Sequence, residues 1–383
     1  MKQIYLDYAA ATPMSQACLQ AMDPFFTDKF YNPSATYIAA KSVKKSVAGC
    51  RQIIAATIGA RPSEIIFTAG GTEANNLAVQ GVMRAHVSSN MIVSSIEHDS
   101  VIMPAKLYST QTASVDNNGS VDIDKLTKLI GDETVLVSVG LVNHEIGVIQ
   151  DIKEISYRLR QIRIQRAKNG NNLPLYLHTD AAQAGCYLDL HVARLGVDLM
   201  SVNGGKIYGP KQSGFLYVRT ATNIQPLLFG GGQENSLRSG TENVAGIHGL
   251  AVALCEAQEK RRGETERVLK LNHQFANKLQ KTLSGISINS RSKHSSPHIV
   301  SITISGVDNE RVMMELDERG VMVALGSACS ASNEKPSSVL NAIGLSDADA
   351  RSTLRISFGK LTTEEDVTAA AETLAAVVKS QNR

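Results

Sequence analysis

Short apolar runs alternate with helix-like segments over the first half of the sequence. The runs with the length and residue content of buried strands cover residues 65–68, 91–95, 135–142, 175–178, 199–202 and 215–218. Such an alternation is typical of a parallel sheet that carries helices on its faces. We therefore predict an α/β fold with a mostly parallel sheet.

The C-terminal third has a different pattern. A long, mostly helical stretch follows residue 243 and continues to about residue 283. Beyond it the pattern predicts strands at 299–304 and 354–358, and helices at 310–319 and 364–379. We predict a large domain at 15–262 and a smaller α+β domain formed by 1–14 and 263–383, with the boundary near Arg262 and Gly263.

Polar or glycine-rich clusters follow the first five predicted strands. In parallel sheets ligands bind beyond the carboxyl ends of the strands, so these clusters should share one site. They cover residues 69–73, 97–99, 143–147, 179–183 and 203–206.

Composition and charge narrow the class of protein. The 383 residues are 43% hydrophobic and 20% charged, as in a soluble protein with a large core. The net charge of +3 gives no basic field that would indicate direct nucleic-acid binding. No apolar run is long enough for a bilayer and the N-terminus lacks a signal-peptide core, so we expect a cytoplasmic protein without membrane contact.

The cysteines are scattered and odd in number. None forms a Cys-x-x-Cys pair, which argues against a disulfide framework or a zinc ribbon, and we predict no metal site. They are Cys18, Cys50, Cys186, Cys255 and Cys329.

Gly70–Glu73 follows a predicted strand and opens the helical run 74–83. A helix N-terminus offers unpaired N–H groups and the positive end of a dipole, so a phosphate is a natural ligand. The alternative is a plain glycine turn in which Thr72 caps the helix.

Lys206 lies in the stretch SVNGGKIYGPK, residues 201–211. Most lysines are solvated, but two preceding glycines allow the backbone to approach a ligand and Pro210 fixes the turn behind it. A nucleotide-triphosphate loop is excluded because Met200 and Ile207 occupy two of its fixed positions, and no dinucleotide fingerprint is present. A desolvated lysine is the kind of amine that forms a Schiff base.

Asp180 and His98 each follow a different predicted strand. A carboxylate is costly to bury alone, and one stable use is to pair with the protonated pyridinium nitrogen of pyridoxal phosphate. The alternative for Asp180 is to cap a helix that starts at Ala181. His98 is either structural or placed to stack on a flat cofactor ring and to move a proton. With the phosphate cradle and Lys206, the cofactor interpretation is favoured.

Ordered motifs through nearly the whole chain carry a family resemblance. They include YLDYAAATP (5–13), NPS (32–34), FTAGGTEANN (67–76), EIG (145–147), DAAQ (180–183), KIYGPK (206–211), RSGT (238–241), GSAC (326–329) and LRIS (354–357). The sequence resembles the cysteine desulfurases, pyridoxal-phosphate enzymes with the class V aminotransferase fold. This resemblance implies fold type I, with a mostly parallel seven-stranded sheet in the large domain.

The resemblance also implies roles around the cofactor. Lys206 would bind it covalently and move the proton at the substrate α-carbon. Asp180 would pair with the pyridinium nitrogen, and Gln183 would hydrogen-bond the phenolic oxygen. His98 would stack on the ring and help to deprotonate the substrate thiol.

The phosphate and the substrate carboxylate have their own implied ligands. Gly71 and Thr72 would hold the phosphate together with Thr241, which in this family comes from a second subunit and so implies a homodimer. The carboxylate of L-cysteine would be bound by Arg355 and Asn32, since a guanidinium fork fits a carboxylate well. Asn143 is a further expected substrate contact.

Cys329 would be the nucleophile in a loop of small residues. It would take sulfur from cysteine as a persulfide, leave alanine, and pass the sulfur to an acceptor protein. The other four cysteines are better explained as small buried hydrophobes.

Three positions depart from the family's usual residues. Gly205 stands in place of histidine, Asn203 in place of serine and His144 in place of asparagine, all close to the cofactor. The loss of one charge-assisted phosphate contact would cost about 1.5 to 3 kcal/mol. We expect Asn203 to donate to the phosphate and His144 to replace the asparagine hydrogen bond.

The main hypothesis is a cysteine desulfurase that supplies sulfur for iron–sulfur clusters, tRNA thiolation or DNA phosphorothioation. Housekeeping bacterial members have a further C-terminal tail that helps to dock the iron–sulfur scaffold, and the end of this sequence soon after 364–379 counts against that partnership. An aminotransferase or a selenocysteine lyase is the alternative enzyme, although a transaminase needs no loop thiol. A degenerate, non-enzymatic paralogue is the third possibility.

Overall fold

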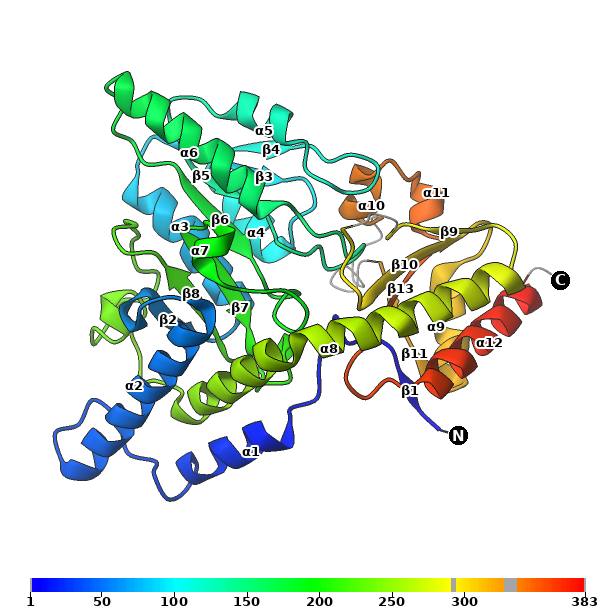
Figure 1. The fold of residues 1–383 in the computed structure, drawn as a ribbon, viewed down its shortest axis with the longest axis horizontal. Coiled ribbons are helices and arrows are strands. Elements are labelled where there is room, and N and C mark those ends of the chain that lie inside the picture. The colour runs from blue at the N-terminus through cyan, green and yellow to red at the C-terminus, as the bar shows by residue number, and fades with distance from the viewer. Residues whose placement is uncertain (1, 291–293, 327–335, 382–383) are drawn as a thin grey trace.

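A seven-stranded sheet forms the larger part of the molecule. The computed structural model describes residues 2–290, 294–326 and 336–381 (Figure 1). In spatial order the strands are β2 (Ile65–Thr68), β8 (Gly214–Val218), β7 (Leu199–Asn203), β6 (Tyr176–Asp180), β5 (Thr134–Ser138), β3 (Asn90–Ser94) and β4 (Ser109–Ala113). β8 is antiparallel to β2 and β7, and the other pairs are parallel. The predicted mostly parallel sheet and its six strands are confirmed.

Helices cover both faces of this sheet because its strands are apolar on both sides. Ile66 and Met91 pack with α3 (Gly71–Ala85) and α4 (Asp99–Ala105). The alternate residues Phe67 and Ile92 belong to the core on the opposite face, which includes the helices that carry Ile54, Leu159 and Leu254. Those helices are α2 (Ile38–Ile58), α6 (Ile152–Lys168) and α8 (Val244–Thr282).

Shorter elements complete this part of the chain. They are α1 (Gln16–Met22), α5 (Ile123–Leu129) and α7 (Val192–Leu195), with the 3-10 turns η1 (Asp23–Phe25), η2 (Pro62–Glu64), η3 (Gly204–Lys206) and η4 (Glu234–Ser236).

The C-terminal part contains two smaller sheets. One has the order β12 (Ala324–Leu325), β13 (Thr353–Ser357), β10 (Ile299–Ile304), β9 (Ile286–Ile288), and the other pairs β1 (Ile4–Tyr5) with β11 (Val321–Met322). The helices here are α9 (Asn309–Glu318), α10 (Ser338–Ala342), α11 (Asp347–Ala350) and α12 (Glu364–Gln381). α8 runs from α1 to the side of α12 (Figure 1). The predicted domain boundary at residues 262 and 263 lies inside this unbroken helix, so the division into domains stays a prediction.

Some sequence-based boundaries were wrong. β4 was missed because it is an edge strand whose residues Ser109–Ala113 are mostly polar and partly exposed. The strand predicted at 135–142 ends at Ser138, and the buried residues after it form the irregular wall of a cavity. Turns, rather than a helix, follow Asp180. Among the described helices, none is both long and apolar enough to span a membrane.

A buried ion pair ties three separate segments together. The Glu234 carboxylate accepts hydrogen bonds from Arg51 Nη1 and Nη2 at 2.7 and 2.5 Å, and from the backbone N–H of Phe67 at 2.8 Å. Glu234, Asn235 and Ser236 all have positive φ, of 50°, 57° and 63°. A left-handed run without glycine is unfavourable, so these contacts hold the turn against its local preference.

We predict that Glu234→Ala destabilises the fold by about 3–5 kcal/mol, because the largely buried Arg51 would keep the Ile65 carbonyl but lose its counter-charge, and the Phe67 N–H would lose its acceptor. The matched control is Glu154→Ala, which breaks the half-exposed Arg158–Glu154 pair and should cost at most about 1 kcal/mol. Urea-unfolding midpoints measure both, and equal shifts for the two variants would contradict the prediction.

Candidate active site

A cavity of about 270 Å³ lies at the carboxyl ends of the strands and receives residues from all five predicted clusters. Ala9, Ala10 and Arg355 line it from the N-terminal segment and from β13, so the cavity lies between the large sheet and the C-terminal sheet. The sequence-predicted residues that line it are Gly71, Thr72, His98, Asn143, His144, Asp180, Gln183, Asn203, Lys206 and Arg355.

Lys206 ends the 3-10 turn η3, which directly follows β7. Its Nζ donates to the backbone carbonyls of Ala9 and Ala10 at 2.7 and 2.6 Å. Gly204 is required in this turn, since a Cβ there would lie 2.2 Å from Ser213 Oγ. The lysine amine is therefore held inside the cavity by the N-terminal segment.

A chain of hydrogen bonds connects Asp180 to His98. Asn75 Nδ2 donates to Asp180 Oδ2 at 2.7 Å and to Ser100 Oγ at 2.8 Å, and Ser100 Oγ lies 2.7 Å from His98 Nδ1. The backbone N–H of Ser100 also donates to His98 Nδ1. Because that atom must accept, the proton of the neutral His98 ring lies on Nε2.

Asp180 is paired although it lies at the end of a buried strand. Besides the Asn75 bond, its Oδ1 accepts the backbone N–H of Ala182 at 2.8 Å. The carboxylate thus closes a turn instead of capping a helix.

The N-terminus of α3 opens into the same cavity. Its N-cap is Gly70, with φ of 127° and no side-chain cap, so the alternative in which Thr72 caps the helix is wrong. A Cβ on Gly71 would lie 3.2 Å from Asn203 Cβ and 3.4 Å from its Nδ2, so the Asn203 amide packs against this helix end. Asn203 Oδ1 accepts from Gly205 N at 3.0 Å, which leaves Nδ2 on the side of α3.

His144 lies next to His98 in the lining of the cavity. The two rings are 5.0 Å apart at an angle of 75°, an edge-to-face contact. His144 Nε2 lies 3.5 Å from Glu145 Oε1, and Ser337 donates to Glu145 Oε2 at 2.6 Å. Asn143 holds this loop, because its Oδ1 accepts the backbone N–H groups of residues 145 and 146.

Arg355 reaches the cavity from β13 with most of its side chain buried. Nη2 pairs with Asp7 Oδ1 at 2.7 Å and Nη1 donates to the carbonyl of His144 at 3.0 Å. Within the described residues its buried Nε has no hydrogen-bond partner. Nη1 and Nη2 have one of these bonds each, so each keeps a second N–H for an anion.

Several predicted residues lie elsewhere. Asn32 is exposed and its Oδ1 accepts from Ser34 N, while Gly205 bonds to Thr12 behind the cavity. Thr241 lines a separate cavity of about 190 Å³. Cys329 lies outside the described residues, so its role stays a prediction.

The other cysteines are reduced. Cys18, Cys50 and Cys186 are buried, as predicted, whereas Cys255 is partly exposed. Burial raises the pKa of Cys50 to about 11 and that of Cys186 to about 12, which leaves both thiols protonated and unreactive at neutral pH.

Comparison with known proteins agrees with this geometry. The Aminotransferase class-V family matches residues 4–369. The chain belongs to this family. A putative cysteine desulfurase IscS 1 of Bacillus subtilis is 39% identical over 387 residues, which cover 99% of each chain. A solved NifS-like protein superposes with a TM-score of 0.90 at 28% identity, covering 99% of this chain and 100% of that one.

A further similar structure was solved with cysteine bound. It is SspA in complex with cysteine, 34% identical, with a TM-score of 0.79 over 93% of this chain and 99% of that one. The class-V chain is thus similar over nearly its whole length to cysteine desulfurases and their structural relatives.

The class-V cavity also contains residues to which the sequence assigned no role. Asn75 and Glu97 were visible inside or beside the motifs, but their contacts depend on folding. Ala9 and Ala10 lie in the motif YLDYAAATP, but their contacts are made by backbone carbonyls, which no sequence pattern reveals. Ser100 gave no signal, because a common serine is not distinctive in a sequence.

Glu97 is the buried acid of this class-V site. Its Oε1 accepts the backbone N–H of Gly140 at 2.7 Å. Burial raises the pKa of Glu97 to about 8, the Gly140 bond opposes this shift, and the negative charge of Asp180 adds to it. The side chain is therefore largely a neutral acid at pH 7.

This pKa has a testable consequence for stability. The pKa of Glu97 is higher in the folded state than its ordinary 4.5, so its stabilising contribution is complete below pH 4.5 and is lost as the pH rises through 8. Glu97→Gln keeps the Gly140 bond but cannot ionise. We predict that wild type loses stability relative to this variant between about pH 5 and 8, by on the order of a few kcal/mol.

Thermal unfolding across that pH range measures the difference. The exposed Glu133→Gln is the matched control and should keep the wild-type pH dependence. Parallel pH profiles for wild type and Glu97→Gln would contradict the prediction.

Proposed function

We propose that the chain is a pyridoxal-phosphate-dependent cysteine desulfurase. It would take sulfur from L-cysteine onto Cys329, form alanine, and pass the sulfur to an acceptor protein. The observation that carries this proposal is the presence of Lys206, Asp180 and the uncapped N-terminus of α3 on one cavity. The similarity to named cysteine desulfurases supports the choice among class-V reactions.

The donor set fits pyridoxal phosphate at each of its polar groups. The N–H groups of the first turn of α3 suit the phosphate, and Asn203 Nδ2 beside Gly71 would add a donor. Asp180 would face the pyridinium nitrogen, and Gln183 the phenolic oxygen. Lys206 would supply the amine for covalent attachment.

When bound, pyridoxal phosphate supplies an electron sink that stabilises negative charge at the substrate α-carbon. Lys206 would move the proton at that carbon, with the carbonyls of Ala9 and Ala10 as a resting place for its amine. Asn75 keeps Asp180 aligned, since it donates directly to Oδ2.

His98 would cover the ring and exchange a proton through Nε2. In the neutral tautomer fixed by Ser100, Nε2 donates. To accept the thiol proton at Nε2, the ring must first carry its own proton on Nδ1, and Nδ1 can then no longer accept the hydrogen bond from the Ser100 N–H. His144 would steady the ring by its edge-to-face contact, which extends the role we predicted for it.

Arg355 would bind the carboxylate of L-cysteine. Asp7 and the His144 carbonyl each take one N–H of the guanidinium and hold it in place, while Nη1 and Nη2 each keep a second N–H as a donor. Because both groups are charged, the hydrogen bond from the guanidinium to the substrate carboxylate would be stronger than one between neutral groups.

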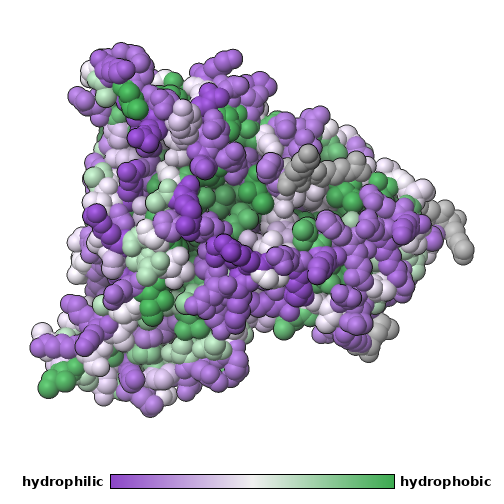
Figure 2. Space-filling view, viewed as in Figure 1, coloured by the Kyte–Doolittle hydropathy of each residue, from purple (hydrophilic) through white to green (hydrophobic). Residues whose placement is uncertain are grey.

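Two copies of the chain would form the complete site. Thr241 lines a different cavity from Lys206, so its predicted phosphate contact requires a second subunit. Phe30, Tyr37 and Ile38 are exposed at or just before the start of α2. A small hydrophobic spot is visible at the lower left of Figure 2, the end of the molecule at which α2 begins in Figure 1. Exposed aromatic and aliphatic residues of this kind are typical of subunit contacts.

We retain two domains, with the large one at 15–262 and the small one at 1–14 and 263–383. Cys329 lies between β12 and α10 of the small domain, and Ser337 anchors the chain just beyond it to Glu145 of the cavity wall. A cytoplasmic location stays our prediction from the sequence.

We predict that the purified protein takes up pyridoxal phosphate and becomes yellow, and that Lys206→Ala loses this absorption because no amine remains for covalent attachment. Lys211→Ala is the matched control; its amine donates to the Thr12 carbonyl and lies outside the cavity lining, so colour should be retained. A wild type that stays colourless with excess cofactor would favour a non-enzymatic paralogue.

We predict that Cys329→Ser lowers sulfide release from L-cysteine on the order of a hundredfold or more, because serine cannot accept sulfur. Alanine and sulfide are measured in the presence of a thiol reductant. Cys255→Ser, which changes the partly exposed cysteine of α8, should keep wild-type rates. If Cys329→Ser is as fast as wild type, the nucleophile is another group.

A further inference from the structure

His298 is a buried histidine beside the cavity that the sequence did not single out. It lies directly before β10 and is 3% exposed. One face of its ring stacks on Tyr187, with centroids 4.3 Å apart and an angle of 15°. Its Nδ1 lies 2.7 Å from Ser296 Oγ and its Nε2 lies 3.2 Å from Gln183 Oε1.

The direction of each hydrogen bond in this chain follows from one backbone carbonyl. Ala9 O can only accept, so the Gln183 side-chain atom 2.9 Å from it is the Nε2 amide. Oε1 of Gln183 then faces His298, so His298 Nε2 must carry a proton and donate it. A neutral imidazole has one N–H, so Nδ1 accepts and Ser296 Oγ donates to it.

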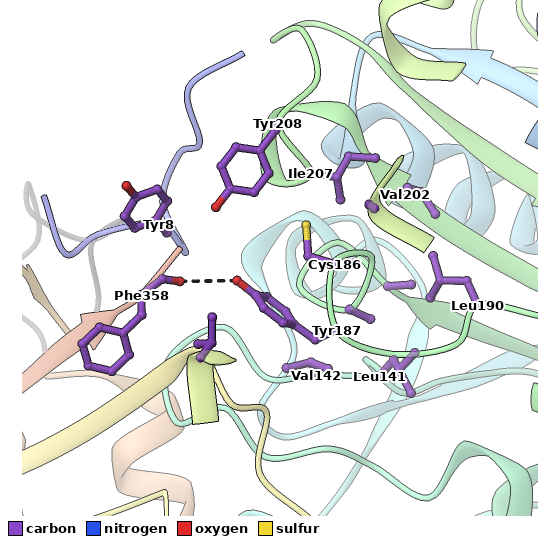
Figure 3. Packing of buried hydrophobic residues seen from close by; sticks show 14 of the residues in the cluster. Tyr8, Leu141, Val142, Cys186, Tyr187, Leu190, Val202, Ile207, Tyr208 and Phe358 are labelled. Carbon is purple, nitrogen blue, oxygen red and sulfur yellow. Dashed lines mark hydrogen bonds between the residues drawn. The ribbon is translucent and has the colours of Figure 1, made fainter. Parts of the chain in front are cut away.

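The carbonyl that sets this order is itself held in place. The backbone N–H of Ala9 donates to Ser357 Oγ at 2.9 Å, and Ala9 O also accepts from Lys206 Nζ. Tyr187, which supports the His298 ring, donates from its hydroxyl to the Phe358 carbonyl at 3.3 Å (Figure 3). The Ala9 carbonyl and the Tyr187 ring that supports His298 are therefore both held by β13 and the residue after it.

Burial, with the positive charges of Arg355 and Lys206, lowers the pKa of His298 to about 3. The ring is therefore neutral at physiological pH and keeps a single N–H. In the described residues, Ala9 O is the one acceptor of the Gln183 amide, so the second N–H of Nε2 remains for a group in the cavity that Gln183 lines.

We propose that His298 is a positioning residue that holds the Gln183 amide in the orientation set by Ala9 O, so that an N–H, and not Oε1, faces the phenolic oxygen of bound pyridoxal phosphate. This inference rests on the proposed cofactor. A rotated amide would place Oε1 against both that oxygen and Ala9 O, and His298 would have to move its proton to Nδ1 and reverse the Ser296 bond to accept the amide N–H. The donated N–H would stabilise negative charge on the phenolic oxygen and so lower the pH at which the bound cofactor loses its proton.

Two variants separate the hydrogen bond from the packing. His298→Phe keeps a ring on Tyr187 but has no N–H, and His298→Gln keeps a donor near the position of Nε2. For His298→Phe we expect the dissociation constant of pyridoxal phosphate to rise about three- to tenfold. The midpoint of the pH titration of the bound cofactor's visible absorption should rise by about half to one unit. His298→Gln should restore most of both values.

A second background tests whether the effect passes through Gln183. In Gln183→Ala protein, His298→Phe should change neither the affinity nor the titration midpoint further, because the amide to be oriented is gone. Equal effects in the two backgrounds, or no effect of His298→Phe in the wild-type background, would overturn the proposal. A wild type that binds no pyridoxal phosphate would overturn the proposed function as well.

The cofactor-free protein gives an independent measurement. Long-range ¹H–¹⁵N spectra of histidine-labelled wild type should show a histidine with its proton on Nε2 that does not titrate between about pH 6 and 9. This signal, assigned by its loss in His298→Gln, remains available if His298→Phe fails to fold. A proton on Nδ1 would overturn the proposed order of hydrogen bonds.

Discussion

The backbone of Ala9 is the contact on which the cavity depends. Its N–H is bound by Ser357 of the C-terminal sheet, and its carbonyl accepts from both Lys206 and Gln183 of the large sheet. Asp7, in the same segment, adds a second link to the C-terminal sheet because its carboxylate pairs with Arg355. A short segment near the N-terminus thus joins the two sheets and fixes the groups around the cofactor site, although it has little regular structure of its own.

The charged groups of the site are stable because each has a partner. Asp180 accepts from Asn75 and Ala182, Arg355 pairs with Asp7, and Glu97 is kept largely neutral by burial. Fixed dipoles and paired charges need little rearrangement when a ligand binds, which is the usual basis of electrostatic preorganisation. The same arrangement makes the site sensitive to the orientation of one amide, that of Gln183.

Much of the fold and most of the site could be predicted from the sequence. Buried strands such as Ile65–Thr68 and Leu199–Asn203 are marked by continuous apolar runs. Of the ten predicted site residues that line one cavity, nine do so because parallel strands end at the same edge, and Arg355 comes from β13 of the other sheet. Edge strand β4 was missed since its residues are not buried on both faces. Thr241 could not be placed by pattern alone, and in the folded chain it lines another cavity.

The sequence by itself determined which chemical groups follow the strands: a glycine-rich helix start, an aspartate and a lysine each come after an apolar strand. It could do so because local hydrophobic patterns and short motifs depend on neighbouring residues. Only the tertiary structure decided which atoms meet. The contacts Ala9–Lys206, Asn75–Asp180 and Gln183–His298 join residues 105 or more positions apart, and the direction of each hydrogen bond depends on a carbonyl or amide that no sequence pattern orients.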